Sequence, residues 1–458
     1  MELVMHADSR SINDAYHPST TIHEYEKVSC ASSSHRLQSE LPIIVVDGCE
    51  DAIDVEVKLQ DNTKDEQKSD SGGKVKLKFL NGLRGMASLM IVHTHAGYLK
   101  ESTIAPSGVD IFFVLSAFLL TMLNEPKINK LVAHRDGPRK WLITLLDYFV
   151  KRILRVYPLF ASVAFILTCM PEKTRTHYYN LAHYHIQHWS LWEILTFQRR
   201  YYLFWTLPIE ITYYFIIPVF LLGVCLLGKF KWLAIGPLYI WVYYEGGHIY
   251  RGGHGEFRPQ LSTFVAGSLA AVVCSALSKT MKKCLFEPRI WQLGIIRCFE
   301  LTMVSCMLSN ISRGDFKQWF RLFPSPDPVV PSVSLPVSAI IVIETLLPSA
   351  ISRALEWNFL CYTGKISFSM YLLHPFVNFL PFLTKLQRID QFVVRLILVY
   401  ALATVSYFLI ERPSQRLAIT IGKKLARYAV SAPARVEATS QSLVARLVAS
   451  LRPTDADP

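Results

Sequence analysis

The sequence lacks the cysteine patterns of disulfide-rich domains and zinc sites. Its nine cysteines are scattered over 458 residues without a Cys-x-x-Cys pair, so neither a disulfide framework nor a zinc finger is expected. It also lacks an RNA-binding signature, an internal repeat and the continuous apolar start of a cleavable signal peptide. The net charge of +12 comes mainly from basic residues beside hydrophobic runs, which indicates membrane topology rather than nucleic-acid binding.

Charged residues are scarce, at 18% of the chain, whereas hydrophobic residues make up 51%. Several apolar runs are long enough to cross a bilayer, which takes roughly 20 residues. This composition predicts an all-α, polytopic transmembrane helical bundle of about ten spans. The expected spans are residues 79–99, 108–123, 155–170, 205–228, 230–244, 260–277, 290–310, 333–351, 366–383 and 391–410.

Composition also divides the chain into regions. The expected regions are a disordered cytosolic tail at 1–73, a transmembrane domain at 74–413 and a basic cytosolic tail at 414–458. Residues 442–451 have amphipathic spacing, typical of a helix on the membrane surface or of a frayed tail. Lysines directly before the first span favour a cytosolic N-terminus in a multi-pass protein of the plasma membrane or an endomembrane.

The first span, Phe79 to Leu99, carries ionisable residues that a membrane helix usually excludes. Arg84 and His95 are eleven positions apart, close to three helical turns, so they share one face about 16 Å apart. His93 points to the opposite side. Ionisable groups inside a membrane helix indicate a functional site; the alternative is that Arg84 snorkels to the interface and His95 bonds a neighbouring helix.

Further polar residues cluster near the ends of other spans. Asp110 opens the second span, where a helix dipole would also explain an acid. Glu210 begins an apolar run, as an interfacial residue or as a buried carboxylate. Three cations lie at the start of the helix of the third span, where they could anchor the helix or bind phosphates. These cations are Lys151, Arg152 and Arg155.

Two later clusters complete the set. Arg258 ends a loop rich in glycine and histidine. Ser367, Tyr371 and His374 follow each other at i, i+4 and i+7, on a single helical face. Small polar residues also commonly pack membrane helices against each other.

Together these blocks resemble the membrane acyltransferase 3 family, which consists of integral-membrane O-acyltransferases. LRGMASLMIVHTH is similar to the family's signature of an arginine and a histidine separated by ten residues. The segments GVDIFFVLSAF, RILRVYP, WTLPIE, FRPQLSTFVAG, GKISFSMYLLHP and LIERP resemble the remaining blocks in the expected order. The resemblance covers roughly 79–413. This sequence departs from the family pattern at Ala117, Thr206 and Ile211. Because Ile211 stands where the family commonly has a second acid, a carboxylate pair at 210–211 is not expected.

The resemblance implies about ten spans, an acyl-CoA co-substrate without a permanently bound cofactor, and transfer to an alcohol. Base catalysis suits an imidazole, so His95 is the candidate base. Either Asp110 or Glu210 could orient it.

The expected binding residues divide by substrate. Arg84, Arg152 and Arg155 are candidates for the CoA phosphates, and Lys151 joins them. Acceptor binding is assigned to Arg258, Ser367, Tyr371 and His374. The acceptor is a hydroxylated small molecule or a sugar; the apolar bundle and the absence of an appended lumenal domain favour a small lipophilic alcohol of secondary metabolism.

Three alternatives stay open at this point. A two-step reaction would acylate Ser116 or Ser367 first. A proton-coupled transporter would use the buried Arg, His and Glu residues as a relay. A metal could bind the histidine-rich loop at 177–188, although no carboxylate or cysteine completes a usual ligand set there, so a solvated loop and no metal are expected.

Overall fold

The computed structural model describes residues 45–46, 56–58, 75–98, 104–179, 189–248, 256–312 and 333–431. All of them belong to one compact unit, Leu41–Pro458. Most of the predicted N-terminal tail, the three later histidines of the 177–188 loop and the 442–451 segment lie outside these residues.

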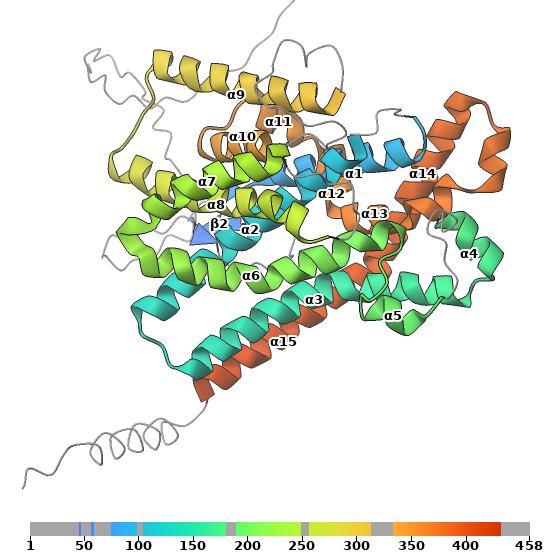
Figure 1. Cartoon of the computed structure of the whole chain (residues 1–458), viewed down its shortest axis with the longest axis horizontal. Coiled ribbons are helices and arrows are strands. Elements are labelled where there is room, and N and C mark those ends of the chain that lie inside the picture. Colours follow the sequence, from blue (N-terminus) through green and yellow to red (C-terminus); the bar gives the residue numbers. More distant parts are fainter. Residues whose placement is uncertain are drawn as a thin grey trace, which may run out of the picture. The chain divides into compact units, whose positions relative to one another are not determined.

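Helices dominate the described part of the chain (Figure 1), which confirms the all-α prediction. The helices are α1 (Lys78–His95), α2 (Ile104–Ala133), α3 (Pro138–Cys169), α4 (Glu172–Tyr178), α5 (Leu191–Leu195), α6 (Thr206–Leu227), α7 (Lys231–His248), α8 (Arg258–Lys283), α9 (Ile290–Ser312), α10 (Ser334–Leu346), α11 (Ala350–Leu355), α12 (Asn358–Lys365), α13 (Ser367–Asn378), α14 (Arg388–Ser406) and α15 (Arg412–Ser431). Short turns join some of them: η2 (Tyr202–Trp205), η3 (Gly228–Phe230), η4 (Pro381–Lys385) and η5 (Tyr407–Glu411).

Three very short strands precede the helices. The strands β1 (Val45–Val46), β2 (Glu56–Lys58) and β3 (Val75–Lys76) form an antiparallel sheet in the order β1-β2-β3. Val45 pairs with Lys58, and Val57 pairs with Val75. The sheet therefore leads the chain directly into α1.

Six helical stretches among the described residues are long and apolar enough to cross a membrane. They are Ile104–Ala133, Pro138–Cys169, Tyr202–Glu245, Arg258–Lys283, Ile290–Ser309 and Arg388–Arg427. Tyr202–Glu245 contains α6 and most of α7, which are separated at Gly228, where φ is +49°. Helices α10 and α13 have only 13 and 12 residues, shorter than a full crossing requires. Ten spans thus remain a prediction.

Helices α2 and α8 form the interior of the bundle. In each, 72% of the most apolar window is buried, against 22% for Tyr202–Glu245 and 17% for Ile290–Ser309. α1 packs against α2, α12 and α13, and α2 packs against α8 and α6. Because α1 lies between α2 and α13, any polar residue on these facing sides is held inside the protein.

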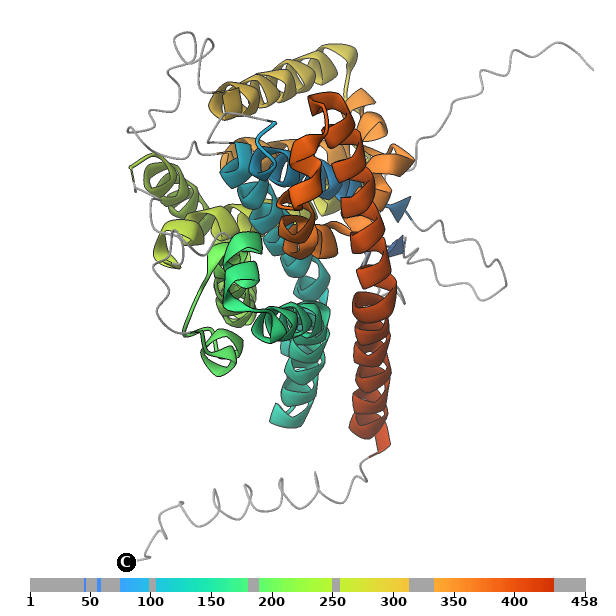
Figure 2. The same cartoon turned by 90° about the vertical axis from the view of Figure 1, so that its right-hand side faces the viewer.

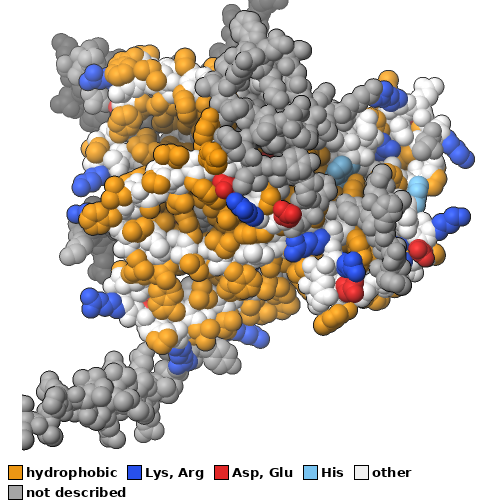
Figure 3. All heavy atoms as spheres, in the orientation of Figure 1, with side chains coloured by type: hydrophobic (Ala, Val, Ile, Leu, Met, Phe, Trp, Pro, Cys, Tyr) orange, Lys and Arg blue, Asp and Glu red, His pale blue; other side chains and the backbone are white. Residues whose placement is uncertain are grey.

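The outer helices expose large hydrophobic side chains. Phe215 and Val219 on α6, Leu233 and Ile240 on α7, and Leu409 in η5 are each more than half exposed. Figure 3 shows one face covered by hydrophobic side chains, with most Lys and Arg at the left and right of the view. An exposed apolar surface of this extent is expected of a protein surrounded by lipid.

The first part of the predicted C-terminal tail is helical. α15 begins at Arg412 and continues to Ser431, and it lies alongside α3 (Figures 1 and 2). A Cβ at Gly422 of α15 would approach the carboxylate of Asp147 on α3. Residues 414–431 therefore pack on the membrane domain.

Three glycines let α1 approach α11 and α12 closely. A Cβ at Gly82 would overlap the carbonyl oxygen of Leu355, and one at Gly85 would overlap that of Leu360. A Cβ at Gly364 of α12 would overlap the carbonyl oxygen of Asn81. Small residues commonly permit such backbone contact between membrane helices.

We expect Gly85→Ala to destabilise the protein by about 1–3 kcal/mol, because the new methyl group must push α1 away from α12. The measurement is the thermal unfolding midpoint of the detergent-purified protein. Gly223→Ala is the matched control, because a Cβ at Gly223 of α6 meets nothing within 4 Å. Equal midpoints for both variants would contradict the proposed close contact.

Candidate functional site

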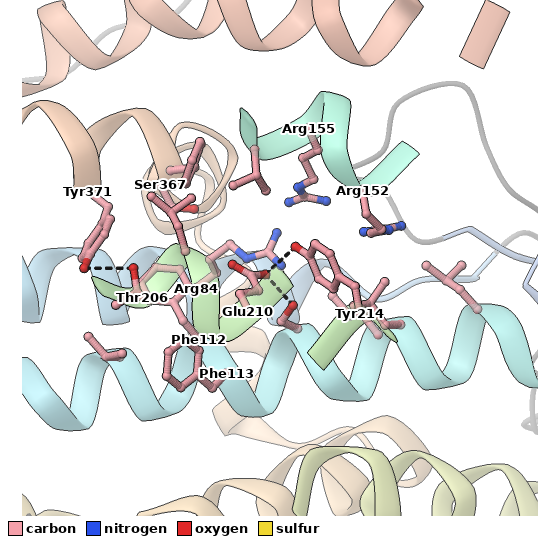
Figure 4. A pocket seen from close by; sticks show the side chains of 18 residues that line it. Arg84, Phe112, Phe113, Arg152, Arg155, Thr206, Glu210, Tyr214, Ser367 and Tyr371 are labelled. Atoms are coloured by element: carbon pink, nitrogen blue, oxygen red, sulfur yellow. Dashed lines mark hydrogen bonds between the residues drawn. The ribbon is translucent and has the colours of Figure 1, made fainter. Parts of the chain in front are cut away.

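A cavity of about 110 Å³ lies in the interior of the bundle. Its walls come from α1, α2, α3, α6 and α13, and Figure 4 shows the principal side chains. Phe112 and Phe113 of α2 form part of an apolar wall, whereas polar side chains gather on the other sides. Three consecutive helices (α1, α2 and α3) and two later ones (α6 and α13) thus line one space.

Three arginines give the cavity a positive end. Arg152 and Arg155 share one face of α3 because they are three residues apart, and both line the cavity with Arg84 of α1. Arg84 is only 9% exposed, and its charge interacts with those of both α3 arginines. The Nε atom of Arg152 is buried and has no hydrogen-bond partner among the described residues. Like charges buried this close together favour a bound anion.

Glu210 of α6 supplies a carboxylate beside Arg84 (Figure 4). Its Oε1 atom accepts hydrogen bonds from Ser116 Oγ and from the Tyr214 hydroxyl, each at 2.8 Å. Tyr214 lies one turn after Glu210 on α6, and Ser116 comes from α2. These two hydroxyls orient the carboxylate inside the cavity.

A second carboxylate lies near the arginines. Glu411 is buried in η5, a π-helical turn, and accepts a hydrogen bond from the Ser369 hydroxyl of α13. Its charge interacts with those of Arg155 and Arg84. Single π-helical turns frequently occur at functional sites. Two carboxylates therefore face three arginines, which leaves an excess of positive charge.

The other end of the cavity carries hydroxyl groups. Thr206 Oγ1 lies 3.3 Å from the Tyr371 hydroxyl, which donates to the Leu203 carbonyl oxygen at 3.1 Å. Ser367 lines the cavity one turn before Tyr371 on α13. Figure 4 shows Tyr371 and Arg152 on opposite sides of Arg84.

An imidazole pair adjoins this hydroxyl end. Nδ1 of His95 lies 3.0 Å from Nε2 of His374, which is one turn after Tyr371 on α13. The ring centre of Tyr202 is 5.7 Å from that of His95. His93 instead lies against Phe392 of α14, with ring centres 5.1 Å apart. His95 thus faces α13, whereas His93 faces α14.

Tyr179 supports the imidazole pair from the end of α4. Its hydroxyl donates to the Leu372 carbonyl oxygen of α13 at 2.8 Å. Burial raises the pKa of the Tyr179 hydroxyl well above its usual value, so the group stays protonated and remains a donor. This contact holds α13 beside the ring of Tyr202, which is 6.0 Å from that of Tyr179.

Five predicted site residues lie outside the cavity lining: the imidazole pair His95 and His374, and Asp110, Lys151 and Arg258. Asp110 is buried, but α2 begins at Ile104, so Asp110 lies in the second turn, where the helix dipole is a weaker explanation for it. Lys151 pairs with Asp147 at 2.8 Å. Arg258 has an 80% exposed side chain, 3.9 Å from Glu245.

The site also contains residues that were not predicted to act with their partners. Tyr214 could have been found, because it is at i+4 from Glu210 on the same helix. Ser116 beside Glu210, and Glu411 beside Arg155, had no such signal, because their partners are on other helices. No group of three or more histidine, cysteine, aspartate or glutamate residues within the described part of the chain is placed to hold a metal ion.

Comparison with known proteins identifies the family. A family model described as "Acyltransferase domain", of the acyltransferase 3 family, matches residues 77–412. The match covers well over half of the chain and every residue of the cavity. No curated protein and no solved structure matches the chain. This match favours an acyltransferase over the transporter alternative. The chain therefore belongs to the acyltransferase 3 family and is an integral membrane acyltransferase with several apolar helices.

Proposed function

We propose that this protein transfers an acyl group, preferably acetyl, from acyl-CoA to a hydroxyl group of a small lipophilic metabolite or a sugar. The observation that supports this proposal is the polarity of the cavity. Its positive end contains Arg84, Arg152 and Arg155. Tyr371 lines its opposite end, and the imidazole pair of His95 and His374 lies behind Tyr371, with the rings of Tyr371 and His374 centred 6.3 Å apart. Acyl-CoA suits such a site, because its phosphates and its thioester lie at opposite ends of the molecule.

The arginines fit the phosphates of CoA. Phosphate oxygens accept short, charge-assisted hydrogen bonds from guanidinium groups. The buried Nε–H group of Arg152 can donate such a bond. Arg84 and His95 are about 16 Å apart along α1, which leaves room for an extended pantetheine arm. Because CoA is made in the cytosol, this orientation puts the arginine end and the N-terminus on the cytosolic side.

His95 is the proposed general base. It accepts the proton of the acceptor hydroxyl, whose oxygen attacks the thioester carbonyl carbon; the carbon–sulfur bond then breaks, and the sulfur leaves with that proton. Glu210 holds the Arg84 guanidinium by its charge. The apolar wall at Phe112 and Phe113 favours a lipophilic acceptor over a highly hydrated one.

The acceptor can be found by comparing metabolites of a wild-type strain and a strain that lacks the gene. We expect the deletion strain to lose a compound and to accumulate one lighter by an acetyl increment. Membranes containing the protein should then release free CoA thiol from acetyl-CoA when the deletion-strain extract is added. Unchanged metabolites together with no thiol release would refute the proposed activity.

We expect His95→Gln to lower kcat by about 10²–10⁴-fold, because the substituted amide cannot take the acceptor proton. The measurement is thiol release from acetyl-CoA in membranes with equal amounts of protein. His93→Gln is the control, because His93 faces α14, away from the cavity. Wild-type turnover in His95→Gln would remove His95 from the mechanism.

Arg152→Gln should raise KM for acetyl-CoA, because a phosphate loses a charged donor. The increase should be smaller with acetyl-pantetheine, which lacks the nucleotide phosphates. Lys140→Gln is the control on the same helix, because Lys140 is exposed and pairs with Asp136 at 2.7 Å. If both donors lost affinity equally, Arg152 would not contact the phosphates.

The proposed one-step reaction, in which no side chain is acylated, also predicts the turnover of Ser116→Ala. This variant loses a hydrogen bond to Glu210, so turnover should fall without being abolished. Acid-quenched wild-type protein should retain no radiolabel from labelled acetyl-CoA. A stable acyl-protein that disappears in Ser116→Ala would instead establish the two-step route.

A further inference from the structure

We propose that His374 is a positioning residue that fixes the tautomer of His95, so that Nε2 of His95 is the basic nitrogen. This inference rests on the proposed function and extends it. It gives His374 a different task from the acceptor binding expected from the sequence.

The structure shows a chain of three groups. His374 Nδ1 lies 3.2 Å from the Met370 carbonyl oxygen, one turn earlier on α13. His374 Nε2 lies 3.0 Å from His95 Nδ1. The two ring planes differ by only 16°, with ring centres 5.2 Å apart. With two ring nitrogens in contact at this centre separation, the imidazoles meet edge to edge, as a hydrogen bond between ring nitrogens requires.

The chain determines which nitrogen carries each proton. A carbonyl oxygen only accepts hydrogen bonds, so Nδ1 of His374 carries the proton. A neutral imidazole has one N–H group, so Nε2 of His374 is an acceptor and Nδ1 of His95 is the donor. His95 then carries its lone pair on Nε2, at the other side of its ring.

A doubly protonated His374 would reverse the direction of the second bond. The His374 side chain is 0% exposed, and it has no ion pair with a carboxylate within the described part of the chain. A buried cation without a counter-charge is costly. The neutral form, with both ring nitrogens engaged, is therefore the favoured one.

His374 also does not contact the cavity. Tyr371 and Ser367 of the same helix line it, whereas neither His374 nor His95 is among the lining residues. Both ring nitrogens of His374 are already engaged, by the Met370 carbonyl oxygen and by His95, so His374 acts on the reaction through His95. When His95 takes the acceptor proton on Nε2 and passes it to the leaving sulfur, its Nδ1–H bond to His374 persists, and the ring keeps its orientation.

The first test compares two substitutions of similar size. Glutamine places an amide oxygen near the position of Nε2 and can accept from His95, whereas leucine cannot. We expect His374→Leu to lower kcat by about 10²-fold with little change in KM for acetyl-CoA, less than the roughly 10⁴-fold loss from a wrong tautomer in a catalytic triad. His374→Gln should recover much of this loss. His93→Leu is the matched control on α1.

The kinetic outcomes separate the two roles. Equal kcat losses in His374→Gln and His374→Leu at equal protein levels would overturn the tautomer assignment, because the acceptor atom would then not matter. A rise in KM for the deletion-strain acceptor with unchanged kcat would also overturn it, in favour of acceptor binding.

The second test does not depend on catalysis. The protein in lipid, labelled with ¹⁵N-histidine, is studied by solid-state NMR, and the His95 signals are assigned by their loss in His95→Gln. We expect neutral His95 to be protonated on Nδ1 in the wild type and to shift towards Nε2 protonation in His374→Leu. Nε2-protonated His95 in the wild type would refute the inference, even if thiol release had already established the acyltransferase activity. Conversely, a protein without thiol release but with the expected spectrum would lose only the proposed function.

Discussion

The burial of three arginines around one cavity is the constraint on which the rest of this structure depends. Guanidinium groups stay charged in proteins, so they need anions or polar partners when they leave water. Glu210 and Glu411 provide two carboxyl groups, and hydroxyls from Ser116, Tyr214 and Ser369 orient them. The remaining positive charge makes the cavity suitable for a phosphorylated donor.

Helix α1 connects this charged region to the imidazole pair. Arg84 and His95 are on the same side of α1, so one rigid helix sets their separation. The glycines that bring α1 against α11 and α12 leave little freedom for it to shift. The same close packing puts His95 within hydrogen-bond distance of His374. Packing and chemistry are thus coupled through a single helix.

Much of the fold was predictable because lipid imposes simple rules on sequence. Each expected span overlaps a helix, because backbone groups in hydrocarbon must satisfy each other within the helix, although the expected spans 333–351 and 366–383 run past the ends of α10 and α13. The ends were less predictable: α2 extends to Ala133 and α3 starts at Pro138, well before the apolar run begins. Hydropathy does not report polar helical turns that pack against other protein elements, as α15 does against α3.

Helical periodicity and the ordered motifs, read from the sequence alone, determined that Arg84 and His95 share a face, that Ser367, Tyr371 and His374 share another, and that the chain resembles acyltransferases. Only the tertiary structure decided which residues meet: Glu210 with Ser116, Glu411 with the arginines, and His95 with His374. It also separated Lys151 and Arg258 from the cavity. The physical reason is that spacing along a helix specifies a direction for each side chain, whereas the partner in that direction depends on how distant helices pack.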